Sequence, residues 1–288
     1  MFIHERDYFL EGVVPPVISI IGENASSRLQ EYNPTIYLLK DNRIYPVWDS
    51  DREFCMIVQQ LAEKKIDSNI KSLFIVCIGG GLDLSLLTDL FNLDPGKIWG
   101  SNLTEAEFYA LYDLSPALYQ KVRPVIGGIE RLKDLTVRKP ELSFDLISAL
   151  RSVSSLDTRD PVVFEHFFEY ANRLQHDGGY LFVSLFTPNM EPFLQKRLKH
   201  TRPRFFQKEE AETLIIDSGY KTIAYSSYNH QAALNQRFHT EADFTDQPTH
   251  HIFLCQKTGP PNKLAYDRKN GWLNIRMRIS EEDISMAF

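Results

Sequence analysis

The chain has 288 residues, of which 43% are hydrophobic and 12% aromatic, enough to bury one sizeable core or a core with a small appended unit. Its formal net charge of −6 and its isoelectric point near 5.8 argue against a broadly basic surface. Such a surface is what binds nucleic acid or an anionic membrane through phosphate contacts, so we expect a globular protein that binds neither.

Residues 1–50 are expected to form an N-terminal lead-in that could cap a pocket. They hold two apolar, β-leaning segments, and the Asp41-Asn42 pair within the second predicts a hairpin turn. The N-terminus does not resemble a signal peptide, and no apolar stretch approaches the ~20 residues that span a bilayer. The expected location is therefore the cytoplasm.

A helix is expected after this lead-in. Apolar residues recur there on one helical face, namely Phe54, Ile57, Val58 and Leu61. Asp49 or Ser50, just before them, is a residue type that caps the first turn of a helix. We expect this helix to pack on the sheet that follows.

Strand and helix patterns alternate between residues 72 and 257. The expected strands span 73–78, 97–101, 123–126, 144–149, 180–186, 220–226 and 251–256. The expected helices span 83–91, 105–114, 162–174 and 209–218. This alternation indicates an α/β fold with crossovers and a mostly parallel, doubly wound sheet, and the two adjacent last strands favour an antiparallel edge.

Three consecutive glycines, Gly79, Gly80 and Gly81, separate the first of these strands from its helix. Glycine is needed where a chain turns tightly and a ligand approaches its backbone, because a Cβ would clash with both. Three in succession exceed what a turn requires. The run therefore predicts a nucleotide-type cofactor site.

Two further segments stand apart from the alternation. Residues 258–288 contain Asn270-Gly271 before alternating residues, which predicts an appended hairpin and tail. A basic segment, Lys196 to Arg204, could bind an anionic substrate or form a solvated helix face. The expected units are thus residues 1–50, 51–257 and 258–288.

Six segments in the central unit, in this order and spacing, carry a resemblance to a known family. They are IVCIGGGLD, IWGSNLT, VIGGIERL, FDLISALRSV, LQHDGGYLFVSLF and RFFQKEEAETLIIDSGYKTI. Together they resemble the class I, Rossmann-like S-adenosylmethionine-dependent methyltransferases. The resemblance implies a seven-stranded sheet with an antiparallel edge strand, and S-adenosylmethionine as the cofactor.

The resemblance also implies which residues bind that cofactor, since its motifs fall at the carboxyl ends of the strands. The implied residues are Gly79, Gly80, Gly81, Asp83, Asn102, Leu103, Gly128, Ile129, Ala149 and Arg151.

The chain departs from the family at three acidic positions, which here hold Cys77, Asn102 and Gly128. Asn102 could still accept a hydrogen bond from a ribose hydroxyl, without the charge assistance of a carboxylate. This loss corresponds to about tenfold or more in cofactor affinity. Asp83 replaces the third glycine of the turn and could cap the helix that follows.

Two residues near the expected site have alternative interpretations. Arg151 follows the fourth strand, where it could hold an acidic acceptor or form an ordinary salt bridge. His166 lies among apolar residues of a helix and is interpreted as a packed or surface residue rather than a base. The sequence therefore identifies no general base.

No metal site is expected. Cys55, Cys77 and Cys255 are isolated thiols, without the spacing of a zinc site or a disulfide framework. The His250-His251 pair has no cysteine or carboxylate close to it in the sequence.

Three functions remain open. The first is methyl transfer from S-adenosylmethionine to a small-molecule acceptor. The second is a catalytically inactive pseudo-methyltransferase that binds or scaffolds a partner protein, because three acids are absent. The third is an aminopropyltransferase-like enzyme, which the glycine run resembles, although the aspartate that family has after its fourth strand is missing from LISALRSV.

Overall fold

The computed structural model describes residues 18–19, 36–40, 43–46, 49–66, 69–78, 81–102, 105–127, 129–152, 162–191, 204–230 and 247–262. The basic segment up to residue 203 and the hairpin expected beyond residue 262 lie outside these ranges. No helix in the described ranges is long and apolar enough to cross a membrane.

A seven-stranded sheet forms the centre of the molecule, with the order β6-β5-β4-β7-β8-β10-β9. Its strands are β4 (Leu73–Ile75), β5 (Ile98–Asn102), β6 (Val122–Ile126), β7 (Phe144–Ala149), β8 (Gln175–Phe186), β9 (Tyr220–Tyr228) and β10 (His250–Lys257). β4 to β8 pair in parallel, whereas β10 pairs antiparallel with both β8 and the edge strand β9. The structure confirms the predicted α/β fold and its antiparallel edge pair.

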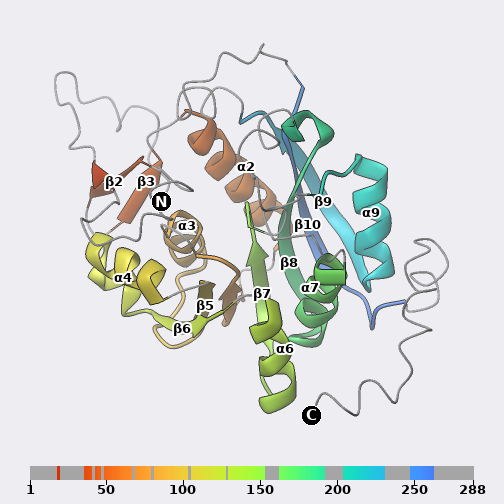
Figure 1. The fold of residues 1–288 in the computed structure, drawn as a ribbon, viewed down its shortest axis with the longest axis horizontal. Coiled ribbons are helices and arrows are strands. Elements are labelled where there is room, and N and C mark those ends of the chain that lie inside the picture. Colours follow the sequence, from red (N-terminus) through yellow and green to blue (C-terminus); the bar gives the residue numbers. More distant parts are fainter. Residues whose placement is uncertain are drawn as a thin grey trace.

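Helices cover both faces of this sheet (Figure 1). One face packs against α2 (Asp49–Lys65), α3 (Leu82–Phe91) and α4 (Glu105–Leu114). The other packs against α6 (Ile129–Arg138), α7 (Val162–Arg173) and α9 (Lys208–Asp217). Two separate apolar cores result, with Phe54 and Leu87 fully buried in the first and Phe168 and Ile215 in the second.

The connections reverse direction between β4 and β7. From β4 the chain runs outward to β5 and β6, and it then returns to β7 on the other side of β4 and runs outward to β8. In open α/β sheets, such a reversal opens a crevice at the carboxyl ends of the two strands, where ligands bind. The topology therefore points to the ends of β4 and β7.

Helix α6 (Ile129–Arg138) was missed by the sequence analysis, which passed from one strand directly to the next. Leu132 is its fully buried apolar side chain and Leu135 is only partly buried, so its apolar stripe is narrow. Two short elements were also unforeseen: α5 (Pro116–Tyr119) and the 3-10 helix η3 (Pro188–Met190).

Two boundaries differ from expectation. Helix α2 begins at Asp49, so Asp49 and Ser50 are its first residues rather than its cap. Strand β8 begins at Gln175 rather than at residue 180, and Gly178 lies inside it where the pairing with β7 is irregular. Gly178 has φ +85°, which glycine adopts without a steric penalty.

The lead-in contains a small three-stranded antiparallel sheet in the order β1-β2-β3. Its strands are β1 (Ile18–Ser19), β2 (Ile36–Lys40) and β3 (Arg43–Pro46). Lys40 pairs with Arg43, which confirms the hairpin predicted at Asp41-Asn42. Strand β3 contacts α3, the helix that follows β4, and also α2.

Candidate functional site

The turn after β4 holds two residues in the left-handed region. Gly81 has φ +84° and is the N-cap of α3, and its N–H donates to the Ile78 carbonyl at 3.0 Å. Cys77 has φ +57°, although it carries a side chain, and its N–H donates to Ser101 Oγ of β5 at 3.2 Å. A positive φ at a residue other than glycine costs roughly 1–3 kcal/mol and is typical of functional sites.

Asp83 lies in the first turn of α3 and does not cap it. The N-cap is Gly81, and no side chain caps this helix end. The prediction of Asp83 as a cap is therefore wrong, because the helix begins one residue earlier than expected. The Asp83 carboxylate still lies at the positive end of the helix dipole and is only 7% exposed.

Arg151 faces Asp83 from the end of β7. Its Nη2 lies 3.5 Å from Asp83 Oδ1, and its guanidinium lies over the ring of Phe54, 4.3 Å from the centroid. Its backbone has φ +55°, and its N–H donates to Ser184 Oγ of β8 at 2.5 Å. The ion pair thus joins the first turn of α3, the helix that follows β4, to the residue pair after β7.

His250, the first residue of β10, lies in an aromatic cluster beside Arg151. Its ring stacks on Tyr228 with centroids 4.8 Å apart, and Phe186 lies edge-on at 5.0 Å. Burial lowers the pKa of His250 well below its ordinary value, and the neighbouring His230 and Arg151 lower this pKa further. His250 is therefore a neutral imidazole at physiological pH.

Asn102 and Ala149 end their strands at the same edge of the sheet. Asn102 is the last residue of β5 and is 2% exposed, and its carbonyl accepts from the Gly127 N–H at 2.8 Å. Ala149 ends β7 and packs into the core under α6 and α7. Ile129 is the first residue of α6.

The structure therefore brings Gly81, Asp83, Asn102 and Arg151 to one edge of the sheet. Four of the expected cofactor residues lie outside the described ranges: Gly79, Gly80, Leu103 and Gly128.

Three residues around Arg151 were not predicted as part of a site. Phe54 was expected only as an apolar helix residue, and His250 was considered only as a metal ligand. Ser184 is the one polar residue in the run LFVSLF, and this interruption of a buried strand was a signal that could have identified it. His166 packs against Tyr170 in α7, as expected of a packed residue.

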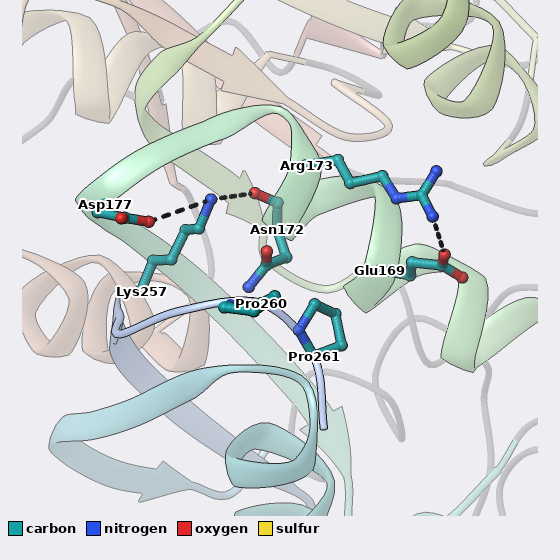
Figure 2. A pocket seen from close by; sticks show the side chains of 7 residues that line it. All are labelled: Glu169, Asn172, Arg173, Asp177, Lys257, Pro260 and Pro261. Carbon is teal, nitrogen blue, oxygen red and sulfur yellow. Dashed lines mark hydrogen bonds and ion pairs between the residues drawn. The ribbon is translucent and has the colours of Figure 1, made fainter. Parts of the chain in front are cut away.

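A pocket of about 330 Å³ lies at the opposite edge of the sheet, where α7 ends and β8 begins (Figure 2). Its walls are formed by Glu169, Asn172, Arg173, Asp177, Lys257, Pro260 and Pro261.

The ammonium group of Lys257, in the wall of this pocket, is already bound by other groups of the protein. Its Nζ donates to the carbonyls of Asn172 at 2.9 Å and Gln175 at 2.6 Å, and it lies 3.5 Å from Asp177 Oδ1. The first of these carbonyls belongs to the last turn of α7, which has no helical donor left for it. Lys257 thus caps α7.

No group of three or more potential metal ligands is present in the described part of the chain. Cys55 and Cys255 are buried free thiols, and Cys77 is a partly buried one. Burial raises the pKa of Cys255 far above its ordinary value, so this thiol stays protonated.

The sequence matches no protein-family model, and no curated protein matches it. Solved structures do match the fold. One is assigned as a sarcosine dimethylglycine methyltransferase from Galdieria sulphuraria, with a TM-score of 0.53, 13% identity, and coverage of 77% of this chain and 92% of that one.

Two further matches are also methyltransferases. A complex of the Trm112 methyltransferase activator with a methyltransferase of Haloferax volcanii has a TM-score of 0.52, 12% identity, and coverage of 73% of this chain and 92% of that one. The CcbJ methyltransferase from Streptomyces caelestis has a TM-score of 0.50, 14% identity, and coverage of 74% and 92%. At these identities the likeness establishes the fold alone. The chain has the Rossmann-like fold of these methyltransferases, as the sequence resemblance implied.

Proposed function

We propose that this protein transfers a methyl group from S-adenosylmethionine to a small-molecule acceptor. One observation carries the proposal: three features lie together at the reversal point of the sheet. They are the left-handed turn at Gly81 after β4, the buried amide of Asn102 at the end of β5, and Arg151 after β7. An open α/β sheet binds its ligand at this point. The methyltransferase resemblance supplies the identity of the ligand.

The residues at the carboxyl edge of the sheet offer the polar groups and the open backbone that S-adenosylmethionine would need. Gly81 presents backbone without a side chain, and Asn102 ends the neighbouring strand. The Ser148 hydroxyl, at the same end of β7, is fully buried and has no hydrogen-bond partner among the described residues. A buried hydroxyl without a partner is costly, so it favours a polar ligand nearby.

In the proposed mechanism the cofactor, when bound, supplies the sulfonium methyl group. The protein has to orient the two reactants and exclude water from them. Asn102 would accept a hydrogen bond from a ribose hydroxyl, and the backbone around Gly81 would approach the amino-acid end of the cofactor.

The remaining expected residues would complete the cofactor site. We propose that Leu103, Gly128 and Ile129 lie against the adenine, and that Gly79, Gly80 and Ala149 contact the cofactor through their backbone. A general base is required only for an acceptor that loses its proton at the transition state.

We further propose that residues 51–257 form the methyltransferase unit and that residues 1–50 cover the acceptor side of the crevice. The contacts of β3 with α3 and α2 support this placement of the lead-in. The net charge of −6 favours a small acceptor over nucleic acid. Residues 258–288 would be an appendage.

Calorimetric titration of the purified protein with S-adenosylmethionine and S-adenosylhomocysteine tests the proposal, with NAD as a nucleotide of another class. We expect micromolar binding of both sulfur nucleotides and none of NAD. Absence of binding up to millimolar concentrations would refute methyl transfer and favour a pseudo-methyltransferase that retains only the fold. Preferential binding of NAD would reassign the site to another cofactor.

A further inference from the structure

Strand β9 lies at the edge of the sheet, and among the described strands it pairs with β10 alone. An edge strand directs every second N–H and carbonyl away from the sheet, where another strand can pair with them. β9 contains no proline, and Lys221 is its one charged residue. From Ala224 to Tyr228 its register with β10 is regular. This part of β9 is therefore a suitable template for a further strand.

The two faces of β9 differ in chemistry. Helix α2 packs on one face, where Ile223 and Ala224 lie partly buried against the apolar core, and Met56 of this helix is 47% exposed. Helix α9 packs on the other face and carries four acids and one lysine. A strand added beyond β9 would therefore favour apolar side chains toward α2 and basic side chains toward α9.

The course of the chain after β10 brings its last residues to this edge. β10 ends beside the start of β9. The Thr258 N–H then donates to the Gly219 carbonyl at 2.9 Å, and the Asn262 N–H donates to the Asp217 carbonyl at 2.7 Å. Both acceptors lie where α9 ends and β9 begins. Residues 263–288, which follow outside the described ranges, thus continue from the start of the edge strand.

Residues 272–279 of this continuation alternate in polarity, as a strand with two different faces does. One set is apolar: Leu273, Ile275, Met277 and Ile279. The other set includes two arginines: Trp272, Asn274, Arg276 and Arg278. At about 3.3 Å per residue such a strand spans roughly 26 Å, and the nine residues of β9 span about 30 Å. The connecting residues 263–271 can extend over about 30 Å, so the strand can run in either direction along β9.

We propose that residues 272–279 form an eighth strand on the outer edge of β9, with their apolar side chains toward α2 and with Arg276 and Arg278 toward the acids of α9. The C-terminal segment then covers the edge and keeps it from pairing with other chains. A second copy of the chain fits this edge less well. Antiparallel pairing of two β9 strands about a two-fold axis places both α9 helices on the same face, acids beside acids. The inference goes beyond the proposed function and does not depend on it.

Amide NMR of the full chain, deuterated and labelled with ¹⁵N, tests the proposed strand directly. We expect nuclear Overhauser effects between amide protons of β9 and those of residues 272–279, and their arrangement gives the direction of the strand. We also expect slow exchange with solvent at every amide from Ala224 to Tyr228. On an uncovered edge, the amides that point away from β10 would exchange rapidly while those bonded to β10 stay protected.

Two variants test the two faces of the proposed strand. Ile275→Asp places a charge on its apolar face and should release it, so the outward amides of β9 exchange about tenfold or more faster. Arg276→Glu should act in the same direction, through repulsion from the acids of α9, and salt should weaken its effect. Val137→Asp is the matched control. It introduces the same charge at a 65% exposed apolar residue of α6 and should leave exchange in β9 unchanged.

The inference is wrong if fast and slow amides alternate along β9 in the unaltered protein, or if Ile275→Asp leaves their exchange unchanged. It is also wrong if the protection of β9 rises with protein concentration together with the sedimenting mass, because a second copy then covers the edge. None of these measurements uses a ligand. A protein that fails to bind S-adenosylmethionine would therefore refute the proposed function and leave this test intact.

Discussion

The two edges of the central sheet hold their charged groups in different ways. At the carboxyl edge, Arg151 and Asp83 are 3.5 Å apart, and two residues with side chains, Cys77 and Arg151, have positive φ. At the amino edge, Lys257 donates to two carbonyls at 2.9 and 2.6 Å. Asp145 there accepts from the Lys71 N–H at 2.8 Å and from the Ser72 hydroxyl at 2.9 Å.

We infer from this difference that the amino edge is structural and that the carboxyl edge is the one that binds a ligand. Short, saturated hydrogen bonds leave little for a ligand to gain, and they stabilise the fold. A long ion pair and strained backbone persist only where other contacts fix them, and they are typical of binding sites. Asn92 is the third residue other than glycine with positive φ in the described chain, but it ends α3, a position that asparagine tolerates well. The pocket in Figure 2 therefore belongs to the structural edge, despite its volume.

The difference between the two edges is tested most strongly by placing a tryptophan at one glycine of each edge. Gly81 and Gly96 have φ of +84° and +83°. Both Gly81→Trp and Gly96→Trp should therefore lose about 1–2 kcal/mol of unfolding free energy from backbone strain.

The two tryptophan variants should differ in ligand binding. Gly81→Trp should lose roughly a hundredfold or more in affinity for S-adenosylhomocysteine, because the indole would occupy the crevice. Gly96→Trp should bind normally, since the nearest neighbour of an added Cβ is the flexible end of Arg123. Calorimetry together with thermal melts measures both effects, and normal binding by Gly81→Trp would remove this turn from the site.

Lys257→Met tests whether the amino edge is structural. The change leaves two carbonyls without their donor, at a side chain only 12% exposed, and should lower the unfolding free energy by about 2 kcal/mol. Lys208→Met is the control, because Lys208 is 42% exposed and its ion pair with Glu212 is long, at 3.7 Å. Its cost should stay below about 0.5 kcal/mol. Denaturant unfolding gives both values, and weaker cofactor binding by folded Lys257→Met would contradict the separation of the two edges.

Asn102→Asp restores a carboxylate at the end of β5. We expect about tenfold tighter binding of S-adenosylhomocysteine, because a carboxylate accepts charge-assisted hydrogen bonds from ribose hydroxyls. The ligand-free variant should be less stable, since the new charge is buried. Asn172→Asp introduces the same change at the other edge, at a residue that is also 2% exposed, and should lose stability without a change in affinity. Unchanged binding by Asn102→Asp would exclude Asn102 from the ribose contact.

The smallest expected effect is a pH dependence at the amino edge. Burial raises the pKa of Asp145, but hydrogen bonds from His176, the Lys71 amide and Ser72 outweigh it and lower this pKa below its ordinary 3.8. Hydrogen bonds to the Asp177 carbonyl and to Asp145 raise the pKa of His176 above its ordinary 6.5.

The two shifts define a window of pH. The His176 contribution to stability is complete below its unfolded pKa and is lost as pH rises through its raised pKa, whereas the Asp145 contribution is lost as pH falls through its lowered pKa. His176→Gln should therefore destabilise the protein most between about pH 4 and 6.5, by less than about 1 kcal/mol because the pair is solvent-exposed. Unfolding curves across this range give the profile, and a loss that is equal at pH 8.5 would show that His176 acts without its charge.

The strands in their chain order and most of the helices between them could be predicted from the sequence, whereas α6 was missed. Residues 144–149 and 105–114 form a strand and a helix with the bounds that their apolar spacing indicated. The glycine run at Gly81 marked the crevice because its conformation requires glycine. Such signals are local, since each depends on residues close together in the chain.

The contacts that position Arg151 could not be predicted, because they join residues far apart in the sequence. Phe54 and Arg151 meet only when α2 packs over the end of β7. The sequence around Phe54 does not show whether its ring packs in the core or lies against a guanidinium. The cap of α3 was misplaced for a related reason. Asp83 is a good capping residue by type, but the left-handed Gly81 ends the turn first.

A crystal structure of the protein with S-adenosylhomocysteine tests the central claim most directly. We expect the ligand at the carboxyl ends of β4 and β7, with its ribose against Asn102 and its amino-acid end beside Gly81. A ligand bound in the pocket beside Lys257, or anywhere away from the reversal point of the sheet, would contradict the claim that the carboxyl edge is the functional one.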